Sequence, residues 1–190
     1  LNQGVGGWTT WHIREYFTKV HATLNADAIT LYIGHNDILT SVPLPYKELY
    51  PLWQQERGQK KVGGWLNQIR LYQALRYIVI SLRKSEMKLA VPIPHAKENL
   101  LAIIEQAGDI QIYLGSEGLS PDPGILYPYN DMMKEVAEAH QNVHYVPIAE
   151  TLSQYAPHQV FLDDCHLTAF GHQIVAKQFQ QAIETTRSIP

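Results

Sequence analysis

The sequence predicts an α/β fold in which a mostly parallel sheet carries helices on both faces, a three-layer α/β/α sandwich. Apolar segments short enough to be strands alternate along the chain with longer segments whose apolar residues recur at helical spacing. Strands are expected at about 28–33, 109–115 and 142–147, and the first of them is apolar on both faces of the pleat, except at Thr30. That pattern is typical of parallel strands buried between two helix layers.

The first half of the chain contains the first helix and the first strand. A helix is predicted at 10–24, because the Thr9–Thr10 pair can cap its start. Its apolar face would consist of Ile13, Phe17, Val20 and Leu24. Gly34 then ends the first strand. The segment 41–64 combines prolines and glycines with aromatic residues, and we interpret it as either a substrate-pocket wall or packing.

The second half predicts the remaining elements. A long helix is expected at 65–82, a turn at 91–94 and a shorter helix around Leu100 to Ile104. After the second strand, a loop at 116–128 leads to a helix that carries apolar residues at helical spacing. Those residues are Met133, Val136 and Ala137. The third strand follows, and a closing helix is expected at 168–185, with Thr168 as its cap.

Composition predicts one domain spanning 1–190 and excludes several classes of function. With 45% hydrophobic and 17% charged residues, the 190-residue chain can bury one compact core. A net charge of -3 without a long basic run argues against nucleic acid as a partner. The single cysteine, Cys165, cannot form an internal disulfide. The longest apolar run, Tyr77 to Leu82, is too short to cross a membrane.

Three polar motifs fall where ligands bind in such a sheet, at the carboxyl ends of its strands. They are GVGGWTT before the first helix, GHND after the first strand and DDCH beyond the third strand. Asn36 offers a neutral amide donor, and the backbone at Gly6–Gly7 is open to a substrate. Asp163 and His166 are spaced i, i+3, so a carboxylate can fix the imidazole tautomer. The set suits acyl transfer, with donors for an oxyanion and a general base for a hydroxyl nucleophile.

Several residues near the DDCH motif have alternative interpretations. Asp164 could replace Asp163 as the orienting acid, although its side chain is expected to point the other way. Cys165 could act as a thiol nucleophile, but a lone cysteine is more often a small buried hydrophobe. His172 is expected to serve the helix start. The remaining histidines lack the carboxylate spacing of a zinc site, so neither a metal nor another cofactor is expected.

The three motifs resemble, in order and separation, the second, third and fifth sequence blocks of the SGNH (GDSL-type) hydrolases. The matching stretches are NQGVGGWTT, LYIGHND and DDCHLTAFGH, and the resemblance covers nearly the whole chain. It implies a flavodoxin-like α/β/α sandwich. It also implies that Gly7 and Asn36 are oxyanion-hole donors, that His166 is the general base and that Asp163 orients it.

One member of the family's site has no match in these residues. The family's nucleophilic serine lies in a Gly-Asp-Ser-like turn after a central strand, upstream of the glycine block at which this chain starts. None of its seven serines lies in such a turn. We therefore expect the serine and the first strand in an N-terminal segment of ~30 to 60 further residues, the size of a βα unit. A pseudoenzyme without the serine is the alternative.

The functional expectation is a serine ester hydrolase that acts on an acyl or acetyl ester, either a small molecule or a glycan. Two alternative functions are compatible with the same fold. An O-acyltransferase would pass the acyl group to a sugar hydroxyl, and a non-catalytic module would bind a glycan or a protein. We expect the 190-residue segment alone to be inactive. The compartment, the acyl chain length and the oligomeric state are left open by these residues.

Overall fold

A computed structural model describes residues 2–23, 25–39, 47, 89–120 and 123–187. The chain divides into two compact units, 1–38 with 91–190, and 39–90. The expected helix at 65–82 lies outside the described residues. So does the aromatic segment at 41–64, apart from Lys47. The first unit contains all three polar motifs.

The sheet of this unit has three parallel strands in the order β1-β2-β3. They are β1 (Ala28–Tyr32), β2 (Gln111–Gly115) and β3 (Val143–Val146). In the register, Thr30 lies beside Tyr113, and Leu114 lies beside Tyr145. The prediction of three parallel strands is confirmed, and their carboxyl ends lie at one edge.

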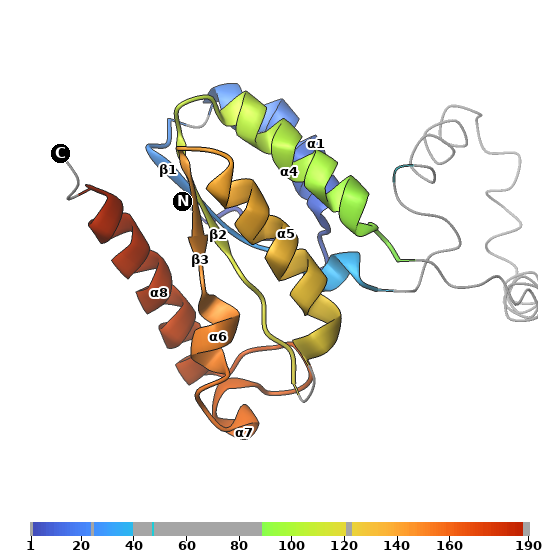
Figure 1. Cartoon of the computed structure of the whole chain (residues 1–190), viewed down its shortest axis with the longest axis vertical. Coiled ribbons are helices and arrows are strands. Elements are labelled where there is room, and N and C mark those ends of the chain that lie inside the picture. Colours follow the sequence, from blue (N-terminus) through green and yellow to red (C-terminus); the bar gives the residue numbers. More distant parts are fainter. Residues whose placement is uncertain (1, 24, 40–46, 48–88, 121–122, 188–190) are drawn as a thin grey trace, which may run out of the picture. The chain divides into compact units, whose positions relative to one another are not determined.

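Helices cover both faces of the sheet, as the sequence predicts (Figure 1). On one face, α5 (Tyr127–Glu138) packs on β2 and β3, and α4 (Ile93–Ala107) packs between α5 and α1 (Thr10–Val20). On the other face, α8 (Ala169–Arg187) packs on β2 and β3. Among the described helices, none is long and apolar enough to cross a membrane.

The central strand β2 owes its burial to this double cover. Ile112, Tyr113 and Leu114 are all at most 1% exposed. Tyr113 belongs to the core on the α8 side, so the alternation of side chains along a strand directs Ile112 and Leu114 toward α4 and α5. The continuous apolar run in the sequence therefore reflects two different cores.

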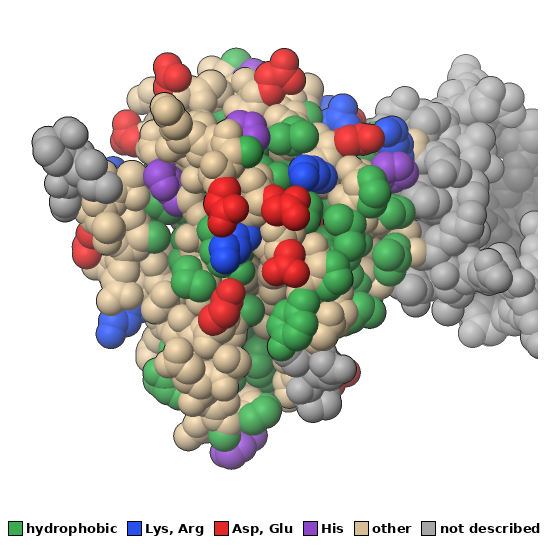
Figure 2. Space-filling model, in the orientation of Figure 1, with side chains coloured by type: hydrophobic (Ala, Val, Ile, Leu, Met, Phe, Trp, Pro, Cys, Tyr) green, Lys and Arg blue, Asp and Glu red, His purple; other side chains and the backbone are tan. Residues whose placement is uncertain are grey.

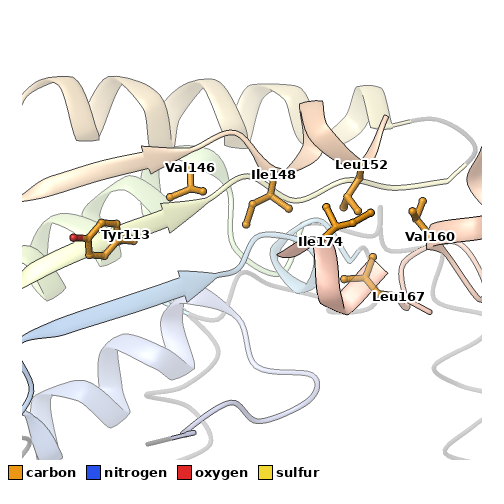
Figure 3. Packing of buried hydrophobic residues seen from close by; sticks show 7 residues of the cluster. All are labelled: Tyr113, Val146, Ile148, Leu152, Val160, Leu167 and Ile174. Atoms are coloured by element: carbon orange, nitrogen blue, oxygen red, sulfur yellow. The ribbon is translucent and has the colours of Figure 1, made fainter. Parts of the chain in front are cut away.

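The core under α8 gathers residues from β2, β3, α8 and two short helices, α6 (Ile148–Leu152) and α7 (Pro157–Val160). Figure 3 shows these side chains in a row that runs from Tyr113 on β2 to Val160 and Leu167 beside the start of α8. The buried members are Tyr113, Val146, Ile148, Leu152, Val160, Leu167 and Ile174. The sequence did not predict α6 and α7, because four or five residues are too few to display a helical period.

Several element boundaries differ from expectation, among them the end of the loop expected at 116–128, which contains a 3₁₀ turn, η4 (Pro123–Leu126), and the start of α5. The first helix ends at Val20 and continues as a 3₁₀ turn, η1 (His21–Thr23), rather than to residue 24. The segment expected as a turn at 91–94 contains the start of α4, with Pro94 in its first turn. Proline is tolerated there because the first N–H groups of a helix have no intrahelical acceptor.

The face seen in Figure 2 has acidic side chains gathered around a few basic ones. One ion pair joins two helices of this layer, where Lys97 Nζ on α4 lies 3.1 Å from Glu135 Oε2 on α5. Both side chains are largely exposed. Such a pair contributes at most about 1 kcal/mol, so the layer is held by its apolar contacts.

Candidate active site

The DDCH motif forms the tip of a small hairpin that we call the acid–base hairpin, residues 161–167. Phe161 and Leu167 form an antiparallel bridge, and the Leu162 N–H donates to the His166 carbonyl at 2.7 Å. The Thr168 N–H donates to the Val160 carbonyl at 2.9 Å. These bonds set the tip, 163–166, as a tight reversal at the end of the sheet where α6 and α7 lie (Figure 1).

The helix after the hairpin is fixed by Thr168 and Gly171. The Thr168 hydroxyl accepts the Gly171 N–H at 3.0 Å and donates to the Gln159 carbonyl at 2.7 Å, so Thr168 caps α8 as expected. A Cβ at Gly171 would lie 2.4 Å from the Val160 carbonyl oxygen. The glycine therefore allows α8 to approach the hairpin closely, and His172 continues the helix by donating its N–H to the Thr168 carbonyl at 2.9 Å.

Asp163 and His166 form a hydrogen-bonded pair at the hairpin tip. His166 Nδ1 lies 2.8 Å from Asp163 Oδ2 and 3.0 Å from Oδ1. This bond places the ring proton on Nδ1 and leaves Nε2, on the far side of the ring, unprotonated. Among the described residues, no group hydrogen-bonds to Nε2. The imidazole is thus oriented as a base toward open space, with side-chain exposures of 74% for His166 and 57% for Asp163.

Two backbone N–H groups stabilise the ionised form of Asp163, the acid of this pair. Asp163 Oδ1 accepts the Cys165 N–H at 3.0 Å and the His166 N–H at 2.8 Å. These two bonds, followed by the bond from the His166 ring, hold the pKa of Asp163 well below its usual range. Asp163 therefore stays ionised at any pH at which the imidazole is neutral, and it can stabilise the imidazolium that forms when His166 takes a proton.

The two neighbours of this pair are placed differently. Cys165 is half-buried, and its Sγ lies 3.5 Å from His166 Nδ1, the ring nitrogen that Asp163 already holds. Burial, and then the charge of Asp163, raise the pKa of the Cys165 thiol, which disfavours the nucleophilic thiolate. Asp164 accepts the Ser120 N–H at its carbonyl, at 2.9 Å, which ties the hairpin to the loop after β2.

One group of possible metal ligands exists in the described part of the chain. The ligand atoms of Asp163, Cys165 and His166 lie within 4.8 Å of one another. His166 Nδ1 would have to give up its hydrogen bond to Asp163 to bind an ion there. The geometry of this trio therefore fits an acid–base pair at least as well as a metal centre.

The GHND motif forms a 3₁₀ turn, η2 (His35–Asp37), which follows β1 and which we call the asparagine turn. Gly34 enters it with φ 141°, a conformation that side chains strongly disfavour, and its carbonyl accepts the Asp37 N–H at 3.0 Å. The Asn36 amide donates from Nδ2 to the Trp8 carbonyl at 3.0 Å. This bond ties the asparagine turn to the glycine motif.

Asp37 anchors the asparagine turn in the protein interior. The residue is fully buried, and its carboxylate accepts the Thr10 N–H at 2.8 Å and the Thr10 hydroxyl at 2.7 Å. Asn99 on α4 donates in turn to the Thr10 hydroxyl oxygen at 3.2 Å. Burial raises the pKa of Asp37 to about 6, although the bonds from Thr10 oppose that shift. A carboxylate thus fixes the start of α1 against the turn.

Gly7 lies one residue before the backbone group that binds Asn36. It is exposed with φ 79°, and a Cβ there would meet no atom within 4 Å. The open surface at Gly7 fits the expectation that a substrate can reach its backbone. The Asn36–Trp8 bond brings the two expected oxyanion donors onto adjoining segments, and their role as donors stays a prediction.

Electrostatic coupling indicates that the asparagine turn faces the acid–base hairpin. The His35 pKa is lowered by burial and then by the charge of His166, while Asp163 and Asp164 raise it. His35 Nδ1 is buried and has no hydrogen-bond partner among the described residues. The GHND and DDCH motifs, far apart in sequence, therefore lie close enough for their charges to interact.

One residue of this region was missed by the sequence reasoning. Glu117, two residues after β2, accepts the His35 N–H through Oε2. Burial raises its pKa to about 7, with an opposing contribution from the His35 bond and a further increase from the charge of Asp37. The only signal in the sequence is a carboxylate two residues after a buried strand, in the segment expected as a loop.

Comparisons with known proteins agree with this fold. The model of the GDSL-like lipase/acylhydrolase family matches residues 1–174. Axe2, an acetylxylan esterase of Geobacillus stearothermophilus, is 17% identical with a TM-score of 0.62, over 96% of this chain and 71% of that one. LAE5, an α/β hydrolase from the metagenome of Lake Arreo, Spain, is 19% identical with a TM-score of 0.61, over the same shares of the two chains.

A family 3 carbohydrate esterase of Clostridium thermocellum is 17% identical with a TM-score of 0.54, over 99% of this chain and 71% of that one. At such low identity these likenesses establish the fold alone. The comparison with curated proteins found no match. Because the family model spans most of the sequence, the chain belongs to the GDSL-like lipase/acylhydrolase family of ester hydrolases.

Proposed function

We propose that the protein hydrolyses an acyl or acetyl ester by serine catalysis through an acyl-enzyme intermediate. The observation that carries the proposal is the 2.8 Å bond between His166 Nδ1 and Asp163 Oδ2, which leaves Nε2 as a free base. A serine hydroxyl is a weak nucleophile until such a base removes its proton. The ring would then return this proton to the leaving alcohol.

Asn36 and Gly7 would stabilise the negative charge of the tetrahedral intermediate. An asparagine amide carries two hydrogens, of which one is donated to the Trp8 carbonyl. The second has no acceptor among the described residues, so it can point to an oxyanion. The open backbone N–H of Gly7 would supply the other donor. Donors fixed before the reaction stabilise the developing charge without reorganising.

We propose that the nucleophilic serine comes from sequence outside these 190 residues. Of the serines in the described part of the chain, none donates its hydroxyl to His166. The Ser116 hydroxyl bonds to Glu150 at 2.9 Å, and that of Ser153 bonds to the Glu150 carbonyl at 2.8 Å. Axe2 was solved with a catalytic serine, aspartate or histidine replaced by alanine, and there the aspartate precedes the histidine by three positions. Asp163 and His166 have the same spacing.

Acetylated carbohydrates are the first substrates to test. Axe2 is an acetylxylan esterase, and the Clostridium neighbour is a carbohydrate esterase. Their low identity to this chain makes them a guide to the substrate class only. Transfer of the acyl group to a sugar hydroxyl instead of water would use the same base and the same oxyanion donors, so the assay must follow both products.

The test compares the complete natural protein with the 190-residue chain. Both are incubated with p-nitrophenyl acetate and with acetylated xylo-oligosaccharides, and free acetate and acylated acceptors are measured. We expect the complete protein to release acetate and the 190-residue chain to be inactive. Turnover by the 190-residue chain alone, lost on replacing Cys165 or one of its seven serines, would contradict an external nucleophile. An inactive complete protein that still binds glycans would favour the non-catalytic module.

A further inference from the structure

We propose that Glu117 is a positioning residue that holds the asparagine turn in the geometry that oxyanion stabilisation requires. The proposal rests on the proposed function, because it assigns Glu117 a role in the same site. Glu117 would not touch the substrate. It would act through the backbone of His35, the residue directly before Asn36.

The first observation is the contact between the carboxylate and the start of the turn. Glu117 Oε2 accepts the N–H of His35, which is the first residue of η2. The first N–H groups of any helical turn have no acceptor within the turn, so an external oxygen must satisfy them. A Cβ at Gly34 would lie 3.5 Å from the same Oε2. The carboxylate thus packs directly against the entry to the turn.

The second observation is that Glu117 is itself held in place. Its N–H donates to Asn130 Oδ1 at 3.1 Å, and its carbonyl accepts from Asn130 Nδ2 at 3.0 Å. Asn130 lies on α5 and is only 5% exposed. One buried amide therefore fixes both backbone groups of Glu117 to the helix layer. The backbone of Glu117 is consequently held by α5 and not by the asparagine turn that its carboxylate contacts.

The third observation is that the other hydrogen bonds of Asn36 and Asp37 go to segments other than the loop after β2. Asn36 bonds to the Trp8 carbonyl, and the Asp37 carboxylate bonds to Thr10. Both partners belong to the N-terminal segment, and the Asp37 carbonyl accepts the Val91 N–H at 3.0 Å from the segment before α4. The hydrogen bond from His35 to Glu117 connects the asparagine turn to the loop that follows β2. Removing the Glu117 carboxylate would leave the His35 N–H unpaired and would let Asn36 shift with the segment that holds Trp8.

The kinetic test compares Glu117→Ala with Glu117→Gln in the complete protein. The glutamine carbonyl can still accept the His35 N–H, whereas alanine cannot. We expect Glu117→Ala to lower kcat by ~10- to 100-fold and to leave KM within about twofold. This loss is smaller than the loss from removing an oxyanion donor altogether, because the donor is displaced and not removed. Glu117→Gln should retain kcat within about threefold. The matched control is Glu150→Ala, since Glu150 accepts the Ser116 and Tyr145 hydroxyls but does not contact the asparagine turn.

A second measurement tests the positioning role of Glu117 independently of esterase activity. Hydrogen exchange of the His35 amide in the complete protein should accelerate at least ~10-fold in Glu117→Ala and stay slow in Glu117→Gln and Glu150→Ala. This result can be obtained even if the protein proves to have no esterase activity. Unchanged His35 exchange in Glu117→Ala would overturn the proposal. So would an equal loss of kcat and thermal stability in both Glu117 variants, because that pattern indicates a purely structural role.

Discussion

The acid–base hairpin and the asparagine turn lie at the same edge of the sheet, yet they are built in opposite ways. In the hairpin, Asp163 and His166 are largely exposed and are held by bonds that span one to three residues around the tip. In the turn, Asp37 is fully buried, and the bonds that fix the turn span 27 residues to Thr10, 28 to Trp8 and 82 to Glu117.

The residues proposed as base and as oxyanion donors therefore depend on different parts of the protein for their positions. Hydrogen bonds within residues 163–166 set the geometry of the hairpin tip. Substitutions in other parts of the protein should therefore leave the Asp163–His166 bond intact. The turn takes its geometry from the N-terminal segment, from Val91 before α4 and from the loop after β2, so it should respond to changes far from Asn36.

Replacing the base should have the largest effect. In the complete protein, His166→Ala should abolish ester hydrolysis, because an unassisted serine hydroxyl is a poor nucleophile at neutral pH. Acetate release measured with saturating p-nitrophenyl acetate checks the loss. Circular dichroism provides the control for folding, since the exposed ring contributes little to the core. Substantial residual turnover would exclude His166 as the base.

Asp163→Asn should lower kcat by up to about 10⁴-fold, the loss known for the orienting aspartate of serine proteases. The asparagine Oδ1 can still accept the Cys165 and His166 N–H groups, so the hairpin should persist. Nδ2 would then face the ring in place of Oδ2, and Nδ1 would become an acceptor. The proton would move to Nε2, which could no longer act as a base.

The matched control for this change is Asp164→Asn. The structure records a role for the Asp164 backbone carbonyl, which the substitution keeps. The kcat of the Asp164→Asn variant should therefore stay close to that of the unchanged protein. Equal losses from the two substitutions would remove the distinction between the adjacent acids.

Asn36→Ala should lower kcat by ~10²- to 10³-fold with little change in KM, because one oxyanion donor is lost while the base remains. Steady-state kinetics on p-nitrophenyl acetate checks the division between the two constants. Asn36→Asp is the matched variant, since it keeps the shape and replaces the donor by a negative charge. It should be at least as defective as alanine. Full activity in either variant would break the assignment of Asn36.

The buried turn should also make stability depend on pH through Glu117. Its pKa is raised from 4.5 to about 7 in the fold, so the fold favours the neutral carboxyl. The resulting stabilisation is complete below pH 4.5 and is lost as pH rises through about 7. Between these limits, unfolding free energy should fall by up to about 3 kcal/mol more in the unchanged protein than in Glu117→Gln.

Urea unfolding of the complete protein and of Glu117→Gln at pH 5 and pH 8 measures this difference. Asp37, His35 and Tyr32 interact with Glu117 and are present in both proteins, so the difference between the two proteins reports the ionisation of Glu117 together with its coupling to these groups. A constant difference between the two proteins across this range would show that the carboxyl is as easily ionised in the fold as in the unfolded chain.

The contrast between the two regions also explains what the sequence could predict. The parallel strands and the flanking helices follow from apolar periodicity, and the acid–base pair follows from a spacing of three residues. Glu117 could not be found this way, because its significance lies in a contact with His35 across 82 residues of chain. The helices α6 and α7 were missed for a different reason, since each is stabilised by packing under α8 and not by its own pattern.

The spans of these hydrogen bonds have a consequence for the order of folding. The hairpin closes a loop of a few residues, a step that short chains complete within microseconds or less. The bond from His35 to Glu117 closes a loop of 82 residues and requires β1 to meet β2. Non-local closures of this kind are slow. During refolding, the imidazole should therefore gain its orienting carboxylate first, and recovery of activity should follow the later closure of the sheet around the asparagine turn.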